Sequence, residues 1–159
     1  MCKPIIFFFT VLLSISVYAD FTGKVVKVTD GDTINVLVAG NILHKVRLTS
    51  IDAPERGQAY GRKSKEYLAD MVAGKQVVVE SEKQDRYGRD LGKVILNGKD
   101  INLEQVKAGM AWWYRYYKKE QPQADQMAYE TAEDSARANR LGLWADPHPI
   151  NPYEWRKSH

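Results

Sequence analysis

The sequence predicts a single α+β domain dominated by β-structure, a small closed or partly open barrel of five short strands with about three helices packed outside. The chain has 159 residues, 44% of them apolar, which is enough for one sizeable core. Short Val-rich segments alternate with segments of helical apolar spacing, and Gly, Asn and Pro separate them. Periodicity alone leaves a sandwich of the same strands open as the alternative.

Three strands joined by tight turns are expected at the beginning of this domain. Residues 21–29, 33–38 and 42–48 are rich in β-branched residues and alternate in polarity. Asp30-Gly31-Asp32 and Ala39-Gly40-Asn41 supply the turns between them. Ala53-Pro54 then ends the strand pattern, because proline cannot donate to a sheet.

Helices and strands alternate in the rest of the chain. Helices are expected at residues 61–72, around 103–110 and at about 122–140, and strands at 76–80 and 91–96. Asn97-Gly98 forms the turn after the last strand. The longest helix carries a stripe of alanines at i, i+4 spacing, which indicates close helix packing: Ala124, Ala128, Ala132 and Ala136.

The first nineteen residues have the composition of a secretory signal peptide. Lys3 precedes an apolar run over residues 5–17, and Ala19 offers a small residue at the expected cleavage point. An uncleaved membrane anchor is the alternative, but a spanning helix needs roughly 20 apolar residues. The only cysteine, Cys2, would leave with the signal, so the remaining chain has no thiol for a disulfide or a metal.

The remaining chain is expected to form one domain over residues 20–146, followed by a flexible tail over residues 147–159. The net charge of +3 is small, but its distribution is uneven. Residues 20–119 carry 18 basic and 13 acidic side chains, whereas residues 120–159 carry 4 and 7. Residues 20–119 are therefore net basic, and residues 120–159 are not, but the small overall charge does not by itself indicate a nucleic-acid-binding protein.

Three clusters place charged side chains at turns or strand ends. They are Asp30-Gly31-Asp32-Thr33, residues 47–55 (RLTSIDAPE) and Asp85-Arg86-Tyr87-Gly88-Arg89. Each alone has a structural explanation: a hairpin turn, a capping carboxylate, or solvated surface arginines. Together they supply what phosphodiester cleavage requires.

Hard oxygen ligands from Asp32 and Asp52 suit Ca²⁺ or Mg²⁺, which polarises a phosphoryl oxygen. Paired arginines can bind a phosphate bidentately, and Glu55 can orient or deprotonate the attacking water. The histidines lie outside these clusters, so a histidine-dependent nuclease is disfavoured.

These motifs, in this order and over about residues 21–144, resemble the staphylococcal (micrococcal) nuclease family. The resemblance implies an OB-fold five-stranded barrel with about three helices and a Ca²⁺-dependent endonuclease that cleaves DNA and RNA to 3′-phosphate ends. It places the metal ligands at Asp32, Asp52 and the main-chain carbonyl of Ala53. It places the catalytic residues at Arg47, Glu55 and Arg89.

The same resemblance implies a substrate-binding surface from Arg86 and Tyr87 and a base-stacking side chain at Tyr117. Arg115 stands where the family has a second tyrosine. In the aromatic and basic segment 111–119, we expect Tyr117, Lys118 and Lys119 to face substrate and the tryptophans to pack mostly in the core.

The sequence therefore predicts a secreted or periplasmic, monomeric Ca²⁺-dependent nuclease with nucleic-acid substrates, no stable protein partner and no membrane contact after signal cleavage. The first alternative is a non-catalytic OB module that binds single-stranded nucleic acid. The second is an exported domain that docks another protein through its acidic helix. The presence of all five catalytic-type residues favours the nuclease: Asp32, Arg47, Asp52, Glu55 and Arg89.

Overall fold

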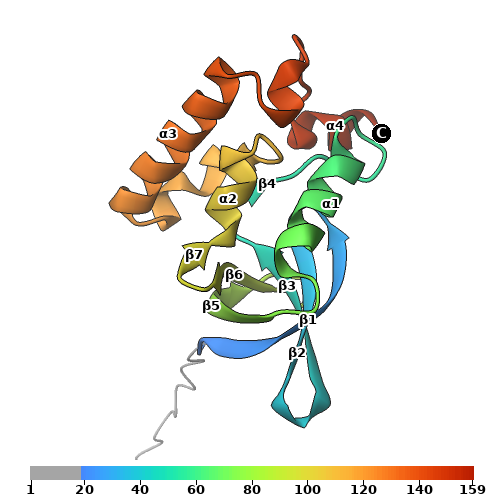
Figure 1. Cartoon of the computed structure of the whole chain (residues 1–159), viewed down its shortest axis with the longest axis vertical. Helices are drawn as coiled ribbons and strands as arrows, with labels where there is room; N and C mark the ends of the chain where they lie inside the picture. Colours follow the sequence, from blue (N-terminus) through green and yellow to red (C-terminus); the bar gives the residue numbers. More distant parts are fainter. Residues whose placement is uncertain (1–18) are drawn as a thin grey trace, which may run out of the picture.

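A computed structural model describes residues 19–159 and shows a closed β-barrel with helices gathered at one end (Figure 1). The five barrel strands are β1 (Phe21–Asp30), β2 (Thr33–Val38), β3 (Ile42–Leu48), β5 (Gln76–Gln84) and β6 (Asp90–Leu96). They pair in the order β3-β2-β1-β5-β6, and a parallel pairing of β3 with β6 closes the ring. This closure resolves the alternative between barrel and sandwich, and the OB-type fold class is confirmed.

Two short strands and the helices complete the domain. β7 (Lys99–Asp100) extends the sheet beyond β6, and β4 (Ile51–Asp52) pairs with β8 (Trp112–Trp113) outside the barrel. The helices are α1 (Gly61–Val72), α2 (Ile101–Lys107), α3 (Gln123–Ala138) and α4 (Pro152–Ser158), with short 3₁₀ turns at Ala39–Asn41, Arg115–Glu120 and Gly142–Ala145.

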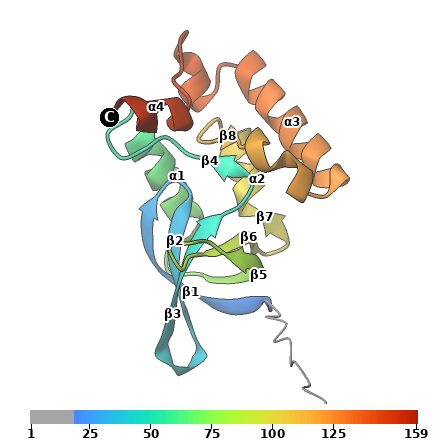
Figure 2. The same ribbon diagram turned by 180° about the vertical axis from the view of Figure 1, so that it is seen from behind.

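The core fills the barrel and the space under α1 and α2. Inward-facing side chains of the strands are almost fully buried, as the period of two in a strand requires: Val25, Ile34, Val36, Val46, Leu48, Val77, Val79 and Val94. Leu68 and Val72 of α1 and Val106 of α2 close this core from the helical side. The β2–β3 hairpin projects from the opposite end (Figures 1 and 2).

The alanine stripe of α3 packs over only half its length. Ala132 and Ala136 are buried, but Ala124 and Ala128 are exposed, and the first turns of α3 are instead attached through the ion pair of Asp125 with Lys93 and the buried Tyr129. Between the buried alanines lies Glu133, which is fully buried and paired with Arg115 and Arg137.

The end of the chain contains a helix where the sequence analysis expected a flexible tail over residues 147–159. Asn151 caps α4 by accepting from the Tyr153 N–H at 2.9 Å, and Pro152 occupies the first turn. The Gln58 amide donates to the Ile150 carbonyl at 2.6 Å, which fixes the approach to α4. Figure 2 shows α4 beside α1 at the helical end of the molecule.

The predicted signal segment, apart from Ala19, lies outside the described residues. Within residues 19–159, no helix is long and apolar enough to span a membrane.

Candidate active site

The β1–β2 turn carries the first carboxylates of the site. The Asp32 N–H donates to Asp30 Oδ1 at 3.1 Å, and Thr33 Oγ1 donates to Asp32 Oδ1 at 3.1 Å. The backbone here lies so close to α1 that a Cβ on Gly31 would be 1.9 Å from Ser64 Oγ. Only glycine fits this position, and it allows the turn to seat against the helix.

A buried glutamine of α2, Gln105, is hydrogen-bonded to this turn. The Gln105 side-chain amide donates to the Gly31 carbonyl at 2.6 Å and to the Ser64 carbonyl at 3.2 Å. Gln105 is fully buried, so both acceptors depend on it rather than on water. The position of the acidic turn is thus set by a hydrogen bond from another element.

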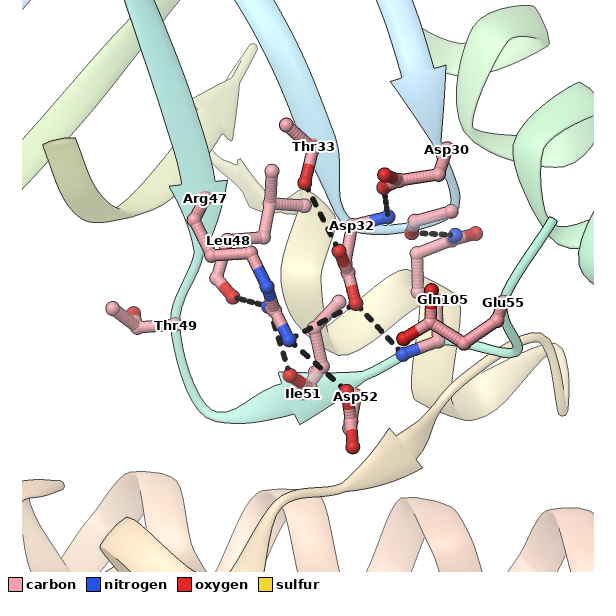
Figure 3. Close-up of polar contacts among 12 residues, drawn as sticks. Asp30, Asp32, Thr33, Arg47, Leu48, Thr49, Ile51, Asp52, Glu55 and Gln105 are labelled. Atoms are coloured by element: carbon pink, nitrogen blue, oxygen red, sulfur yellow. Dashed lines mark hydrogen bonds and ion pairs between the residues drawn. The ribbon is translucent and has the colours of Figure 1, made fainter. Parts of the chain in front are cut away.

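Arg47 lies between two carboxylates (Figure 3). Its Nη2 is 3.0 Å from Asp32 Oδ2 and 3.2 Å from Asp52 Oδ1. Its Nη1 donates to the carbonyls of Leu48 and Ile51. Cross-strand pairing explains the arrangement, because Arg47 is opposite Thr33, and Asp52 lies on β4 just beyond the end of β3.

Burial raises the pKa of two carboxyl groups in the site, those of Asp30 and Asp52. Desolvation, followed by the neighbouring charge of Asp32, raises the pKa of Asp30 to about 6. Burial also raises the pKa of Asp52, although a hydrogen bond from Arg156 and the charge of Arg47 oppose that rise. The site therefore concentrates negative charge that its own arginines only partly offset.

Glu55 lies on the segment between β4 and α1, and its side chain lines the same cavity as Asp32 and Asp52. Its N–H donates to Gln58 Oε1 at 3.0 Å. Its carbonyl lies against Gly61, where a Cβ would be only 2.0 Å away. The first turn of α1 thus fixes the backbone that presents this carboxylate.

The loop between β5 and β6 presents Arg89. Asp85 organises this loop, since its Oδ1 accepts from the N–H groups of Tyr87 and Arg89 at 2.9 and 3.0 Å. Asp85 Oδ2 accepts from Arg89 Nε at 2.7 Å. Burial acts against the charged form of Asp85, but these hydrogen bonds outweigh it and lower the pKa of this carboxyl.

Aromatic side chains form one wall of the cavity. Tyr117 lines it and is half-exposed, and its ring centre is 5.4 Å from that of Tyr114 and 4.8 Å from that of Tyr116. Tyr114 also lines the cavity, which the sequence analysis missed. Arg115 turns away to pair with Glu133 on α3.

Lys118 is not among the cavity-lining residues. Its Nζ lies 5.1 Å above the ring of Trp113, because the 3₁₀ turn directs it back toward the buried indole. The expected burial of the tryptophans holds for Trp113, which is 2% exposed, and in part for Trp112.

One cavity of about 820 Å³ brings together nine of the ten site residues predicted from sequence: Asp32, Arg47, Asp52, Ala53, Glu55, Arg86, Tyr87, Arg89 and Tyr117. The most important addition is Arg156 of α4, which also lines this cavity. Its Nη2 is 3.0 Å from Asp52 Oδ2, and its Nη1 is 2.7 Å from Glu55 Oε1. The capping signals at Asn151 and Pro152 could have revealed the helix, but no local signal reveals where that helix docks.

The residues that converge here fit a hard divalent cation. Asp32 and Asp52 are 7% and 1% exposed, and both contact the same guanidinium nitrogen. Residues 19–159 contain no group of three or more His, Asp or Glu side chains arranged to hold a metal. The predicted set is smaller, two carboxylates and one carbonyl, and such a sparse set leaves coordination positions for water and a phosphate oxygen.

The chain matches the family described as staphylococcal nuclease homologue over residues 45–146. It is 44% identical over 157 residues to an uncharacterized endonuclease of Haemophilus influenzae, covering 99% of this chain and 84% of that protein. It is 44% identical to a micrococcal nuclease of Shigella flexneri, covering 92% and 87% of the two chains. It is 40% identical to the protein ParB of Escherichia coli, covering 88% and 81%.

Replacement of Asp85 with Asn tests the organisation of the Arg89 loop. At neutral pH the free energy of unfolding should fall by about 1 kcal/mol, because asparagine can still accept from the main-chain N–H groups but loses the charge and the second acceptor that bind Arg89. The pKa of Asp85 is lower in the folded protein than its ordinary value of 3.8. Ionised Asp85 therefore stabilises the fold above pH 3.8, and this contribution is lost as the pH falls through the folded-state pKa. The difference in melting temperature between wild type and Asp85→Asn should therefore become smaller at acidic pH.

Asp70→Asn is the matched control, since Asp70 is an exposed aspartate of α1. It should leave the melting temperature unchanged at both pH values. A gap for Asp85→Asn that is as large at pH 3 as at pH 7 would contradict an ionic role for Asp85.

Proposed function

The chain belongs to the staphylococcal nuclease family, and from this membership and the geometry of the site we propose that it is an exported, Ca²⁺-dependent endonuclease that hydrolyses phosphodiester bonds of DNA and RNA. The observation that carries this proposal is the convergence of Asp32, Asp52 and Arg47 in one cavity with Glu55 and Arg89. These are the parts that a phosphodiesterase needs: anionic metal ligands, phosphate-binding cations and a carboxylate for water.

Asp32 and Asp52, with the main-chain carbonyl of Ala53, would hold the cation. Bound there, Ca²⁺ would polarise a phosphoryl oxygen and offset the charge that develops on it. The arginine side chains of the protein would then bind the phosphate and orient it. Arg47 is fixed by its bonds to Asp32 and Asp52, and Arg89 is fixed by Asp85, so both guanidinium groups are ordered before substrate arrives.

Glu55 is the proposed proton acceptor for the attacking water. Its side chain is 40% exposed, so water reaches it, and it lines the cavity that would hold the phosphate. An ionised carboxylate in this place can accept a proton from the attacking water. The bond from phosphorus to the 5′-oxygen would then break, and that oxygen would take a proton from solvent and leave as the 5′-hydroxyl of the downstream fragment. The phosphate stays on the 3′-oxygen of the upstream fragment, which gives the 3′-phosphate ends that the family resemblance implies.

Exposed rings at the cavity mouth support a nucleic-acid substrate with unpaired bases. Tyr87 and Tyr117 line the cavity, and they are 68% and 48% exposed. Arg86 and Arg89 lie 4.9 and 5.6 Å from the ring centre of Tyr87. Aromatic faces beside cations bind single-stranded chains by stacking on bases and pairing with phosphates.

Export is proposed from the first nineteen residues, whose single lysine, apolar run and terminal Ala19 match a cleavable signal. The protein would then meet Ca²⁺ outside the cytoplasm, where weak sites with affinities of about 10⁻⁴ to 10⁻³ M are adequate.

Removal of calcium should abolish cleavage. We expect a short single-stranded DNA to be cut in millimolar Ca²⁺ and to remain intact in excess EGTA, because the carboxylates alone repel the phosphate. Asp32→Asn should remove cleavage while the protein still melts cooperatively. Gel analysis of labelled DNA measures cleavage by both proteins, and a thermal melt verifies that the variant is folded. Full turnover in EGTA would contradict metal dependence, and binding without cleavage at every Ca²⁺ concentration would favour the non-catalytic module.

Glu55→Gln should lower the single-turnover rate by about 10²- to 10⁴-fold with the fold intact, since it removes the proton acceptor but keeps the size of the side chain. Glu82→Gln is the matched control, because Glu82 lines the same cavity but has no proposed part in the chemistry. A purely structural Glu55 would show a lower melting temperature with an unchanged rate.

A further inference from the structure

The C-terminal helix places the guanidinium of Arg156 on two of the carboxylates that the proposed reaction needs, Asp52 and Glu55. Arg156 spans both oxygens of Asp52, with Nη1 3.1 Å from Oδ1 and Nη2 3.0 Å from Oδ2. The same Nη1 donates to Glu55 Oε1 at 2.7 Å. These contacts join residues about one hundred positions apart in the sequence, and the hydrogen bonds to Asp52 raise the pKa of Arg156 above its already high value.

We propose that α4 is an inhibitory latch, in which Arg156 occupies the carboxylates of Asp52 and Glu55 and must leave before the cation binds. This inference rests on the proposed function, because it assigns Asp52 to the metal and Glu55 to the attacking water. The latched state is the one that the structure describes.

Competition follows from the contacts themselves. With Arg47 already bonded to Asp52 Oδ1, the two bonds from Arg156 bring the occupied acceptor positions of this carboxylate to three of about four. The positive charge of Arg156 also repels a divalent ion placed beside it. The same group neutralises Glu55 by a short ion pair, which makes that carboxylate a poorer acceptor for a proton from water. One side chain thus opposes both metal binding and water activation.

Arg47 differs from Arg156 in the way it is held. The Arg47 side chain is 16% exposed, is part of β3, and has two backbone carbonyls as further partners. The Arg156 side chain is 40% exposed, and its polar contacts in the described part of the chain are with Asp52 and Glu55 alone. Arg47 is therefore built into the site, whereas Arg156 is added to it from outside.

The attachment of α4 is light enough to release. The helix has seven residues, of which only Pro152 is buried, and a helix this short is not stable by itself. Its other points of attachment are the Gln58–Ile150 hydrogen bond and Trp155, which borders a hollow of about 50 Å³ beside Pro54. Displacement of Arg156 would therefore free the site without disturbing the barrel.

The test compares three full-length proteins: wild type, Arg156→Gln and Lys157→Gln. Both variants remove one positive charge from the same helix, but Lys157 pairs with Glu154 and does not contact the site. Titration calorimetry with Ca²⁺ alone, without nucleic acid, measures the dissociation constant. We expect Arg156→Gln to bind Ca²⁺ about fivefold more tightly than wild type, the size of a strong, partly exposed ion pair. Lys157→Gln should match wild type.

Arg156→Lys provides a graded case, because it keeps the charge but loses the bidentate fork, and its affinity should fall between those of wild type and Arg156→Gln. Thermal melts in EGTA verify that each protein is folded.

Equal Ca²⁺ affinity in wild type and Arg156→Gln would overturn the latch, and so would weaker binding in the variant, which would make Arg156 part of the binding site. Absence of Ca²⁺ binding in every protein would overturn it as well. The proposed function fails on a separate readout: none of the proteins would cleave single-stranded DNA in Ca²⁺, whatever their affinities for the ion.

Discussion

The concentration of buried negative charge at one end of the barrel is the constraint on which this structure depends. Asp30, Asp32 and Asp52 lie on neighbouring segments, and burial raises the pKa of the first and the last of them. Carboxylates this close repel one another and lose hydration, so the fold needs a positive charge between them. Arg47 provides it, bonded to Asp32 and Asp52 at once.

Much of the surrounding architecture serves to hold that arrangement. Closure of the barrel by β3 and β6 aligns Arg47 with Leu91 and brings the loop that carries Arg89 to the same cavity. Gln105 and Gly31 fix the acidic turn against the helices. The buried carboxylates are thus held by contacts from several elements, whereas the tyrosines Tyr87 and Tyr117 at the same cavity are exposed.

The local elements could be predicted from sequence because their signals are local. Alternation and turn residues gave β2, β3 and α1 with the bounds that the structure shows. The parallel β3–β6 pairing could not be predicted, since it joins strands about forty residues apart and no periodicity records a long-range partner. For the same reason the sequence pattern favoured a barrel but could not exclude a sandwich of the same strands.

In the candidate site, too, local signals could be predicted from the sequence and long-range contacts could not. Asp32, Arg47 and Glu55 stand in charged clusters that each have an ordinary structural explanation, so the three clusters taken together and the family resemblance were needed to indicate them. Lys118 was expected at the substrate surface, but the 3₁₀ turn directs it over Trp113. Arg156 was missed because a capped helix can be recognised from Asn151 and Pro152, whereas its docking on Asp52 depends on the packing of the whole chain end.

The most direct test of the account is the response of Arg47→Met to calcium. If Arg47 and the cation neutralise the same carboxylates, the variant should lose about 3 kcal/mol of unfolding free energy in EGTA. Saturating Ca²⁺ should then raise its melting temperature by more than it raises that of wild type, because the ion replaces the missing charge. An equal rise in melting temperature in the two proteins, or a rise in wild type alone, would contradict the claim that this arginine and a metal ion neutralise the same buried carboxylates.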